Sequence, residues 1–68
     1  MPKFDNIELL NQARRAEFLT VEQLAALLQY TPRTVYRQIR AGQIEGVIRH
    51  GRSIRIHKRA ALATFHDN

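Results

Sequence analysis

The chain has 68 residues, enough for one small domain, and it is strongly basic: 11 Lys and Arg face 6 Asp and Glu, a net charge of +5. Hydrophobic residues make up 44% of it, which predicts a folded core rather than a disordered basic tail. The absence of cysteine excludes disulfides and thiolate sites, and no apolar run is long enough for a membrane span or a secretory signal. We therefore expect a single cytoplasmic domain over 1–68, a complete small gene product with a polyanionic partner.

The first predicted helix covers 6–15. Asp5 and Glu8 have the spacing of a capping box, in which an acceptor side chain is followed three residues later by Glu. Ile7 and Leu10 then follow at helical intervals, which predicts one apolar face.

A pair of helices is predicted next, with about three residues between them. Thr20 and Gln23 again have capping-box spacing, and they begin a helix with apolar residues at helical intervals. Thr31 is a second cap, and Pro32 occupies the first turn of the following helix, where its missing N–H has no effect. Two helices joined by so short a turn predict a helix-turn-helix over 20–41.

The second helix of this pair, 32–41, has the character of a recognition helix. Val35 and Ile39 lie four residues apart and are expected to face the core, while the remaining surface carries arginines. Gly42 is expected to end the helix in a left-handed conformation.

After Gly42 the hydrophobic period changes from 3.6 to 2, which predicts a β-hairpin over 44–57. Two strands, 44–49 and 53–57, are expected on either side of a tip at 50–52. A final short helix is expected at 58–65. The fold class is thus mainly α with a small β-hairpin: a winged helix-turn-helix preceded by a short N-terminal helix.

The positive charge is concentrated in the middle of the chain. Residues 31–59 carry eight cations against Glu45 alone, a balance of +7, whereas residues 1–30 carry three cations against four acids. Seven of the eight are Arg, which forms forked hydrogen bonds to phosphates and guanine edges. This pattern favours nucleic acid as the partner. A basic face that only keeps the protein soluble remains an alternative, and a membrane partner is disfavoured because no long helix opposes these cations with an apolar stripe.

The stretch from Phe18 to Phe65 resembles the excisionase and MerR-like family of small winged helix-turn-helix DNA-binding domains. The matching segments are LTVEQLAALL at 19–28, TPRTVYRQIRAG at 31–42, GR at 51–52 and IRI at 54–56. The resemblance implies that helix 32–41 enters the major groove of double-stranded DNA and that a wing, 49–55, follows the minor groove. One departure is Gln29, which replaces a glycine usual in the family, so the turn either is strained or takes another path.

The candidate DNA-binding residues come from the recognition helix, the wing and the start of the last helix. They are Arg33, Thr34, Tyr36, Arg37, Arg40, Arg49, Arg52, Arg55 and Lys58. Arg37, in the middle of the helix, is the best candidate for a forked contact to guanine, and Arg40 for a phosphate. Tyr36 and Thr34 have alternative structural roles, in packing and in the helix start respectively. Lys58 opens the last helix, where a cation opposes the macrodipole unless a phosphate lies nearby.

Catalysis and metal binding find no support in the sequence. The chain has no glycine-rich phosphate loop, nucleophile elbow or paired-carboxylate pocket, so we expect no enzyme and no cofactor. His50, His57 and His66 are seven and nine residues apart and fit no helical metal-ligand pair. His50 is instead expected near a phosphate and His57 as a helix cap.

The resemblance predicts a sequence-specific architectural protein: an excisionase, or recombination directionality factor, that bends attachment-site DNA for an integrase. We expect it to be encoded by a bacterium, phage or mobile element, to be nucleoid-associated and to bind direct repeats cooperatively. Helix 6–15, with Arg14, Arg15 and Glu17, is a candidate protomer contact. A small AlpA-like or MerR-like transcriptional regulator is the main alternative. A protein-interaction adaptor or antitoxin-like module and an RNA-binding protein are lesser alternatives.

Overall fold

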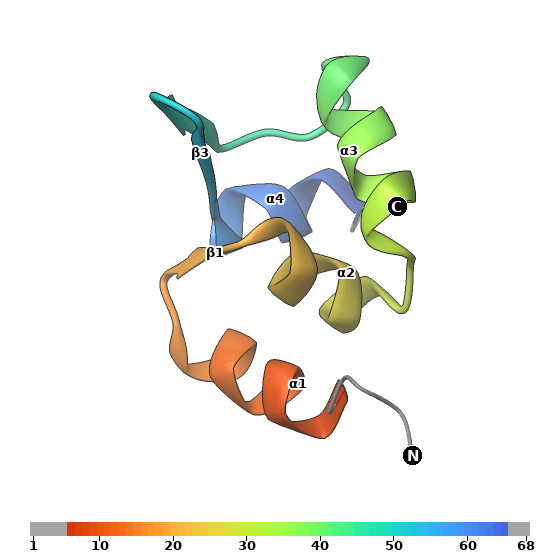
Figure 1. The fold of residues 1–68 in the computed structure, drawn as a ribbon, viewed down its shortest axis with the longest axis vertical. Coiled ribbons are helices and arrows are strands. Elements are labelled where there is room, and N and C mark those ends of the chain that lie inside the picture. The colour runs from red at the N-terminus through yellow and green to blue at the C-terminus, as the bar shows by residue number, and fades with distance from the viewer. Residues whose placement is uncertain (1–5, 66–68) are drawn as a thin grey trace.

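The computed structural model describes residues 6–65, which form four helices and a three-stranded antiparallel sheet (Figure 1). In chain order these are α1 (Asn6–Arg15), β1 (Phe18–Leu19), α2 (Val21–Leu28), α3 (Pro32–Arg40), β2 (Val47–His50), β3 (Ser53–His57) and α4 (Lys58–Phe65). The architecture is that of a winged helix-turn-helix, as the sequence predicts, with β2 and β3 as the wing. The predicted cap of α1 at Asp5 lies outside the described residues.

The two helices of the helix-turn-helix begin at the predicted caps. The Thr20 hydroxyl accepts a hydrogen bond from the Gln23 backbone N–H at 3.1 Å, and the Gln23 side chain accepts one from the Thr20 N–H at 3.0 Å. This confirms the capping box of α2. At the start of α3 the Thr31 hydroxyl accepts a hydrogen bond from the Thr34 N–H at 3.2 Å, with Pro32 in the first turn.

The turn between α2 and α3 is left-handed at Gln29, which has a φ of 60° and a ψ of 36°. The Gln29 N–H donates to the Ala26 carbonyl at 3.3 Å, and the Tyr30 N–H donates to the Ala25 carbonyl at 2.9 Å. These bonds satisfy carbonyls at the end of α2 in the manner of a glycine cap. Of the two predicted outcomes, the strained turn is therefore the one observed, at a cost of about 1 kcal/mol relative to glycine.

The sheet has the strand order β1-β3-β2, and its first strand is absent from the sequence prediction. β1 contains two residues, Phe18 and Leu19, which pair with His57 and Ile56 of β3. Two residues cannot display an alternating pattern, so β1 is defined by its distant partner rather than by any local signal.

The predicted first wing strand, 44–49, is wrong at its start, because β2 begins only at Val47. Ile44 lies in a loop and is buried in the core. Its apolar character therefore reflects core packing, although in the sequence it fits the pattern of a strand. Gly46 then reverses the chain with a φ of 81° and accepts a hydrogen bond from the His57 N–H at 2.8 Å. The wing that results is shorter than predicted and begins next to α4.

The core lies where α2, α3 and the inner face of the sheet meet, and α1 packs against α2. Its largest fully buried side chains are Leu19, Leu24, Val35 and Ile56. Val35 and Ile39 face this core as predicted, so the opposite side of α3 is left to solvent. Within residues 6–65, no helix has both the length and the apolar character that a membrane span requires.

Candidate nucleic-acid interface

The solvent face of α3 carries most of the predicted DNA-binding side chains. Because Val35 and Ile39 are buried four residues apart, Arg33, Tyr36 and Arg37 fall on the exposed side of the helix. Arg40 continues this face by one more turn, and Tyr36 is 47% exposed. About half of Tyr36 is therefore buried, which is compatible both with half-buried packing beside Ile39 and with a contact to DNA.

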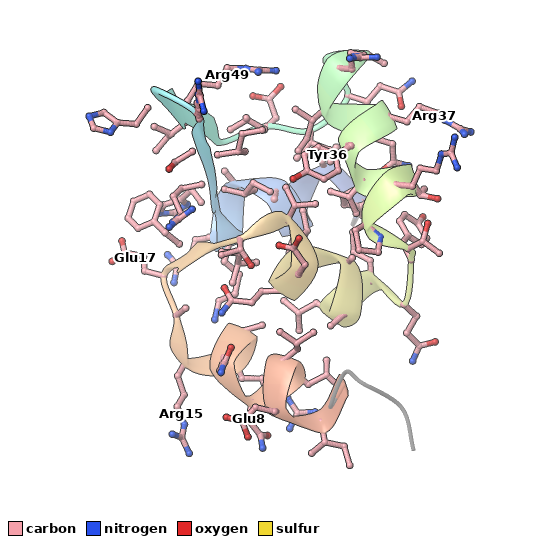
Figure 2. The ribbon with its side chains drawn as sticks, in the orientation of Figure 1. Glu8, Arg15, Glu17, Tyr36, Arg37 and Arg49 are labelled. Carbon is pink, nitrogen blue, oxygen red and sulfur yellow. The ribbon has the colours of Figure 1, made fainter. Side chains whose placement is uncertain are left out.

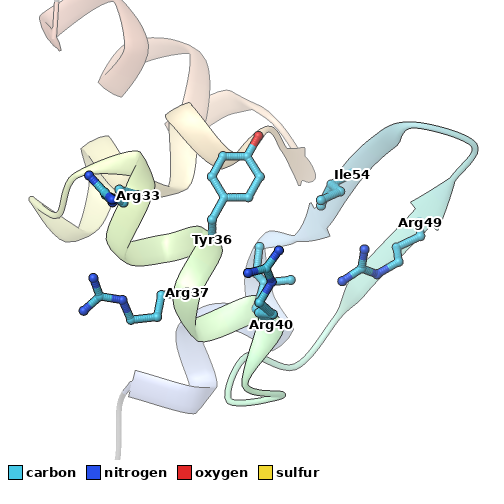
Figure 3. A pocket seen from close by; sticks show the side chains of 7 residues that line it. Arg33, Tyr36, Arg37, Arg40, Arg49 and Ile54 are labelled. Atoms are coloured by element: carbon cyan, nitrogen blue, oxygen red, sulfur yellow. The ribbon is translucent and has the colours of Figure 1, made fainter.

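The register of the wing directs one arginine toward this helix. Arg49 of β2 pairs with Ile54 of β3, on the same face of the sheet as the buried Ile56. Arg49 and Ile54 therefore border, together with α3, an open hollow of about 450 Å³ (Figure 3). The residues that line it are Arg33, Tyr36, Arg37, Ile39, Arg40, Arg49 and Ile54.

Among residues 6–65, no acidic side chain forms an ion pair with the arginines around this hollow. The contact between the His57 ring and the Glu17 carboxylate, at 3.5 Å, lies away from the hollow. The guanidinium groups of Arg33, Arg37 and Arg49 therefore keep their hydrogen-bond donors and their charge for an external anion. Four arginines line this one concave surface together with Ile39 and Ile54, and their charge is complementary to that of a polyanion.

Two other predicted wing residues lie outside the hollow. Arg52 is one of the two loop residues at the hairpin tip, since His50 pairs directly with Ser53. Arg55 is on the outer face of the sheet, and its guanidinium donates to the Ile54 carbonyl at 3.0 Å. Both side chains are exposed, so the wing presents cations at its tip and on both faces.

Lys58 is not brought together with the other predicted residues. Its ammonium group donates to the carbonyls of Ala13 at 2.9 Å and Arg14 at 2.8 Å, which are at the end of α1. A cation at this end of a helix is favourable, because it satisfies carbonyls that lack an intrahelical partner. Lys58 thus joins α4 to α1. These hydrogen bonds compensate for the unfavourable position of a cation at the start of α4, which was the reason to expect a phosphate contact.

Thr34 and His57 also have local partners. The Thr34 hydroxyl lies 3.0 Å from that of Thr31, within the cap of α3, which favours its structural role. The His57 ring accepts a hydrogen bond from the Ala60 N–H at 3.4 Å through Nδ1, so the predicted cap of α4 is confirmed. His66 lies outside the described residues.

Two residues of the hollow, Ile39 and Ile54, are not among the candidate DNA-binding residues, and the sequence predicts only a core position for Ile39. Ile39 is 7% exposed, yet it reaches the hollow between α3 and the wing. The sequence signal that Ile39 both packs in the core and borders the hollow is that it follows Val35 by four residues and directly precedes the exposed Arg40. Ile39 thus lies at the border of the buried face of α3.

The family of the chain follows from the elements just described. Residues 18–60 match the model of the helix-turn-helix domain family, from β1 through the wing to the start of α4. This match covers more than half of the chain, and the chain belongs to the helix-turn-helix domain family.

Two relatives come from Mycobacterium tuberculosis, one from strain CDC 1551 and one from strain H37Rv, and both are provisionally named DNA-binding proteins. Each is 41% identical to this chain over 49 residues, which are 72% of this chain and 62% of the relative. The chain thus spans somewhat less than two thirds of the length of these relatives. No solved structure matches it.

Proposed function

We propose that this protein binds double-stranded DNA through α3 and the wing. The observation that carries the proposal is the hollow lined by Arg33, Arg37, Arg40 and Arg49, none of which forms an ion pair with an acidic side chain among residues 6–65. Unpaired guanidinium groups on one surface match the charge of a phosphate backbone, and their forked donors match guanine edges. The family and the names of the two relatives support the same conclusion.

In the proposed complex α3 lies in the major groove, which is wide enough for a single helix. Arg33 and Arg37 are one turn apart on its exposed face, and they would contact bases or phosphates. The wing, 49–55, would lie along the neighbouring minor groove with Arg52 at its tip. Because Arg49 faces α3 across the hollow, it would contact the backbone strand between the two grooves.

Within DNA binding we favour an architectural role, that of an excisionase acting with an integrase at the ends of a mobile element. The resemblance of the segments at 19–28 and 31–42 supports it. One protomer contributes a nine-residue helix and a short hairpin, which limits its contacts. Bending DNA costs of order 1–6 kcal/mol, so several protomers on adjacent direct repeats are needed. The longest dimension of the chain is 35 Å, close to one helical turn, which favours repeats spaced by about 10 base pairs.

A mobility-shift titration on duplex DNA flanking the gene, repeated at several salt concentrations, tests this function. We expect a ladder of cooperative complexes that weakens steeply as salt rises, because phosphate contacts release counterions. Arg37→Ala should bind at least tenfold more weakly, whereas Arg15→Ala, a matched change on α1, should bind nearly as well. A single complex at a palindrome would indicate a transcriptional regulator instead. Equal binding by the unaltered protein and Arg37→Ala would contradict the proposed interface and favour an adaptor.

A further inference from the structure

A second hollow, of about 490 Å³, lies between α1, α2 and the left-handed turn. Its lining residues are Leu9, Leu10, Glu22, Ala25, Ala26, Gln29, Tyr30, Thr31 and Pro32. Leucine and alanine side chains form its apolar part, and Glu22, an exposed carboxylate, is the one acid in this lining. The sequence could not predict this hollow, because it exists only once α1 packs on α2. This second hollow could bind an apolar side chain that has a cation beside it, because its wall is apolar and Glu22 supplies a negative charge.

The β2–β3 hairpin carries such a group. Ile48 is 47% exposed, on the outer face of the sheet away from α3. Its cross-strand partner is Arg55, so an aliphatic side chain and a guanidinium group project side by side. Covering Ile48 with a partner would be favourable, because it would remove apolar surface from water. Neither Ile48 nor Arg55 lines the hollow between α3 and the wing.

The hairpin and the second hollow are at opposite ends of the molecule. In Figure 1 the hairpin is at the upper left, whereas α1 and the turn between α2 and α3 are in the lower half. The hairpin therefore cannot reach the hollow of its own chain. When an apolar group fits a pocket elsewhere on the same molecule, the contact joins successive copies and does not close into a dimer.

We propose that Ile48 of one copy packs into the second hollow of a neighbouring copy while its Arg55 pairs with the neighbour's Glu22. This inference rests on the proposed function, since it names the surfaces by which copies on adjacent direct repeats touch. The occupant is a second copy because the charges are complementary: Glu22 lies in the lining of the hollow, and Arg55 lies beside Ile48 on the hairpin. The contact is head to tail, and it leaves α3 of both copies facing the DNA.

The contact revises the expected role of α1. From the sequence, helix 6–15 with Arg14, Arg15 and Glu17 is a candidate protomer contact. In the proposed assembly α1 contributes Leu9 and Leu10 to the apolar wall of the hollow. Arg15 points away from the rest of the molecule (Figure 2) and takes no part.

Disulfide trapping tests the contact directly, because the natural chain has no cysteine. A protein with both Glu22→Cys and Ile48→Cys is oxidised on duplex DNA from the gene's flanks and analysed on a non-reducing gel. We expect a ladder of dimers, trimers and higher forms that reduction abolishes. Monomers alone, as expected if another part of the chain fills the hollow, would overturn the proposal. A ladder that stops at dimers would overturn it as well, since it indicates a closed contact.

Binding cooperativity provides the second test, on duplexes with one or two binding sites. Ile48→Asn should lower the cooperativity factor about tenfold, as expected from the loss of a buried aliphatic side chain. Ile7→Asn is the matched control, because Ile7 is 70% exposed but belongs to neither surface. Glu22→Gln should lower cooperativity, and Glu45→Gln, a change of another exposed acid, should not.

The two proposals fail differently in this experiment. If the unaltered protein does not bind the one-site duplex, the DNA-binding function is wrong. If it binds that duplex but fills two sites independently, only the head-to-tail contact is wrong. Equal cooperativity of Ile48→Asn and Ile7→Asn would also overturn the contact alone.

Discussion

Two cationic regions of this small protein differ in what their charges contact. At the junction of α1 and α4, Lys58 of α4 donates hydrogen bonds to two backbone carbonyls of α1. On the face formed by α3 and the wing, Arg33, Arg37 and Arg49 have no acidic partner within the described part of the chain. In the first region the charge of Lys58 joins two helices, whereas in the second the charges of the arginines are available to another molecule.

The comparison shows that the number of cations in a segment does not by itself locate a binding site. Lys58 and Arg49 belong to the same basic stretch of sequence, and both are candidate DNA-binding residues on that ground. A guanidinium group surrounded by other cations is stabilised by an external anion, whereas an ammonium group bound to carbonyls already has its partners. We therefore propose that the arginines of the α3 and wing face contact DNA, and that Lys58 stabilises the packing of α4 against α1.

The largest expected effect comes from removing equal charge from the two regions. The interface variant is Arg33→Ala/Arg37→Ala/Arg40→Ala, and the control is Arg14→Ala/Arg15→Ala/Arg59→Ala. DNA affinity of the interface variant should fall at least about 100-fold, with a shallower salt dependence, because base and phosphate contacts are both lost. The control should lose less than about fivefold, since it changes only long-range attraction. Equal losses of DNA affinity in mobility-shift titrations would contradict the claim that the two cationic regions differ in their contact with DNA.

Gly46→Ala should cause the largest loss of stability, about 3 kcal/mol, by disturbing the connection between α3 and the wing. A Cβ at Gly46 would lie 2.8 Å from the Cβ of Ala60, and the φ of 81° is unfavourable for alanine. Gly42→Ala is the control, because Gly42 has a similar φ of 74° but a Cβ there would meet nothing within 4 Å. Urea denaturation should show a clearly smaller loss for the control, and similar losses would mean that the contact with α4 is unimportant.

Lys58→Met should lower the free energy of unfolding by about 2 kcal/mol, because it removes two charge-assisted hydrogen bonds to the end of α1. The DNA affinity of the folded protein should change by less than about threefold if Lys58 is a structural residue. Arg59→Met, a change of the exposed neighbouring cation, should leave stability nearly unchanged. A stable Lys58→Met protein with greatly weakened DNA binding would reverse the assignment and restore the phosphate contact expected from sequence.

The smallest effect is expected at the turn. Gln29→Gly should raise the free energy of unfolding by about 0.5 kcal/mol, since glycine adopts the left-handed conformation without strain. The gain is less than the full strain because glycine also increases the entropy of the unfolded chain. Thermal unfolding measures it, and a lowered melting temperature would show that the Gln29 side chain contributes more than its backbone strain removes.

The sequence predicts those parts of the fold that local interactions determine. The helices begin at caps such as Thr20 and Thr31, whose partners are three residues away, so their positions follow from spacing alone. β1 and the true start of β2 depend on pairing with β3 and on the packing of Gly46 against α4, which only the folded chain brings about.

The same division holds for the candidate site. The arginines of α3 follow from helical periodicity, because the buried Val35 and Ile39 define the opposite face. The inward direction of Arg49 depends on the register of the hairpin, and the engagement of Lys58 depends on how α1 packs. Neither can be read from the charge pattern.

The most direct test of the proposed interface is a titration of the isotope-labelled protein with a DNA duplex, followed by the backbone amide resonances in NMR spectra. We expect the largest shifts at residues 32–40 and 49–55, with those at the junction of α1 and α4 small. The shifts should diminish as salt is added, because phosphate contacts dominate the affinity. Shifts concentrated around Arg15 and Arg59, with α3 unaffected, would contradict the assignment of DNA binding to α3 and the wing.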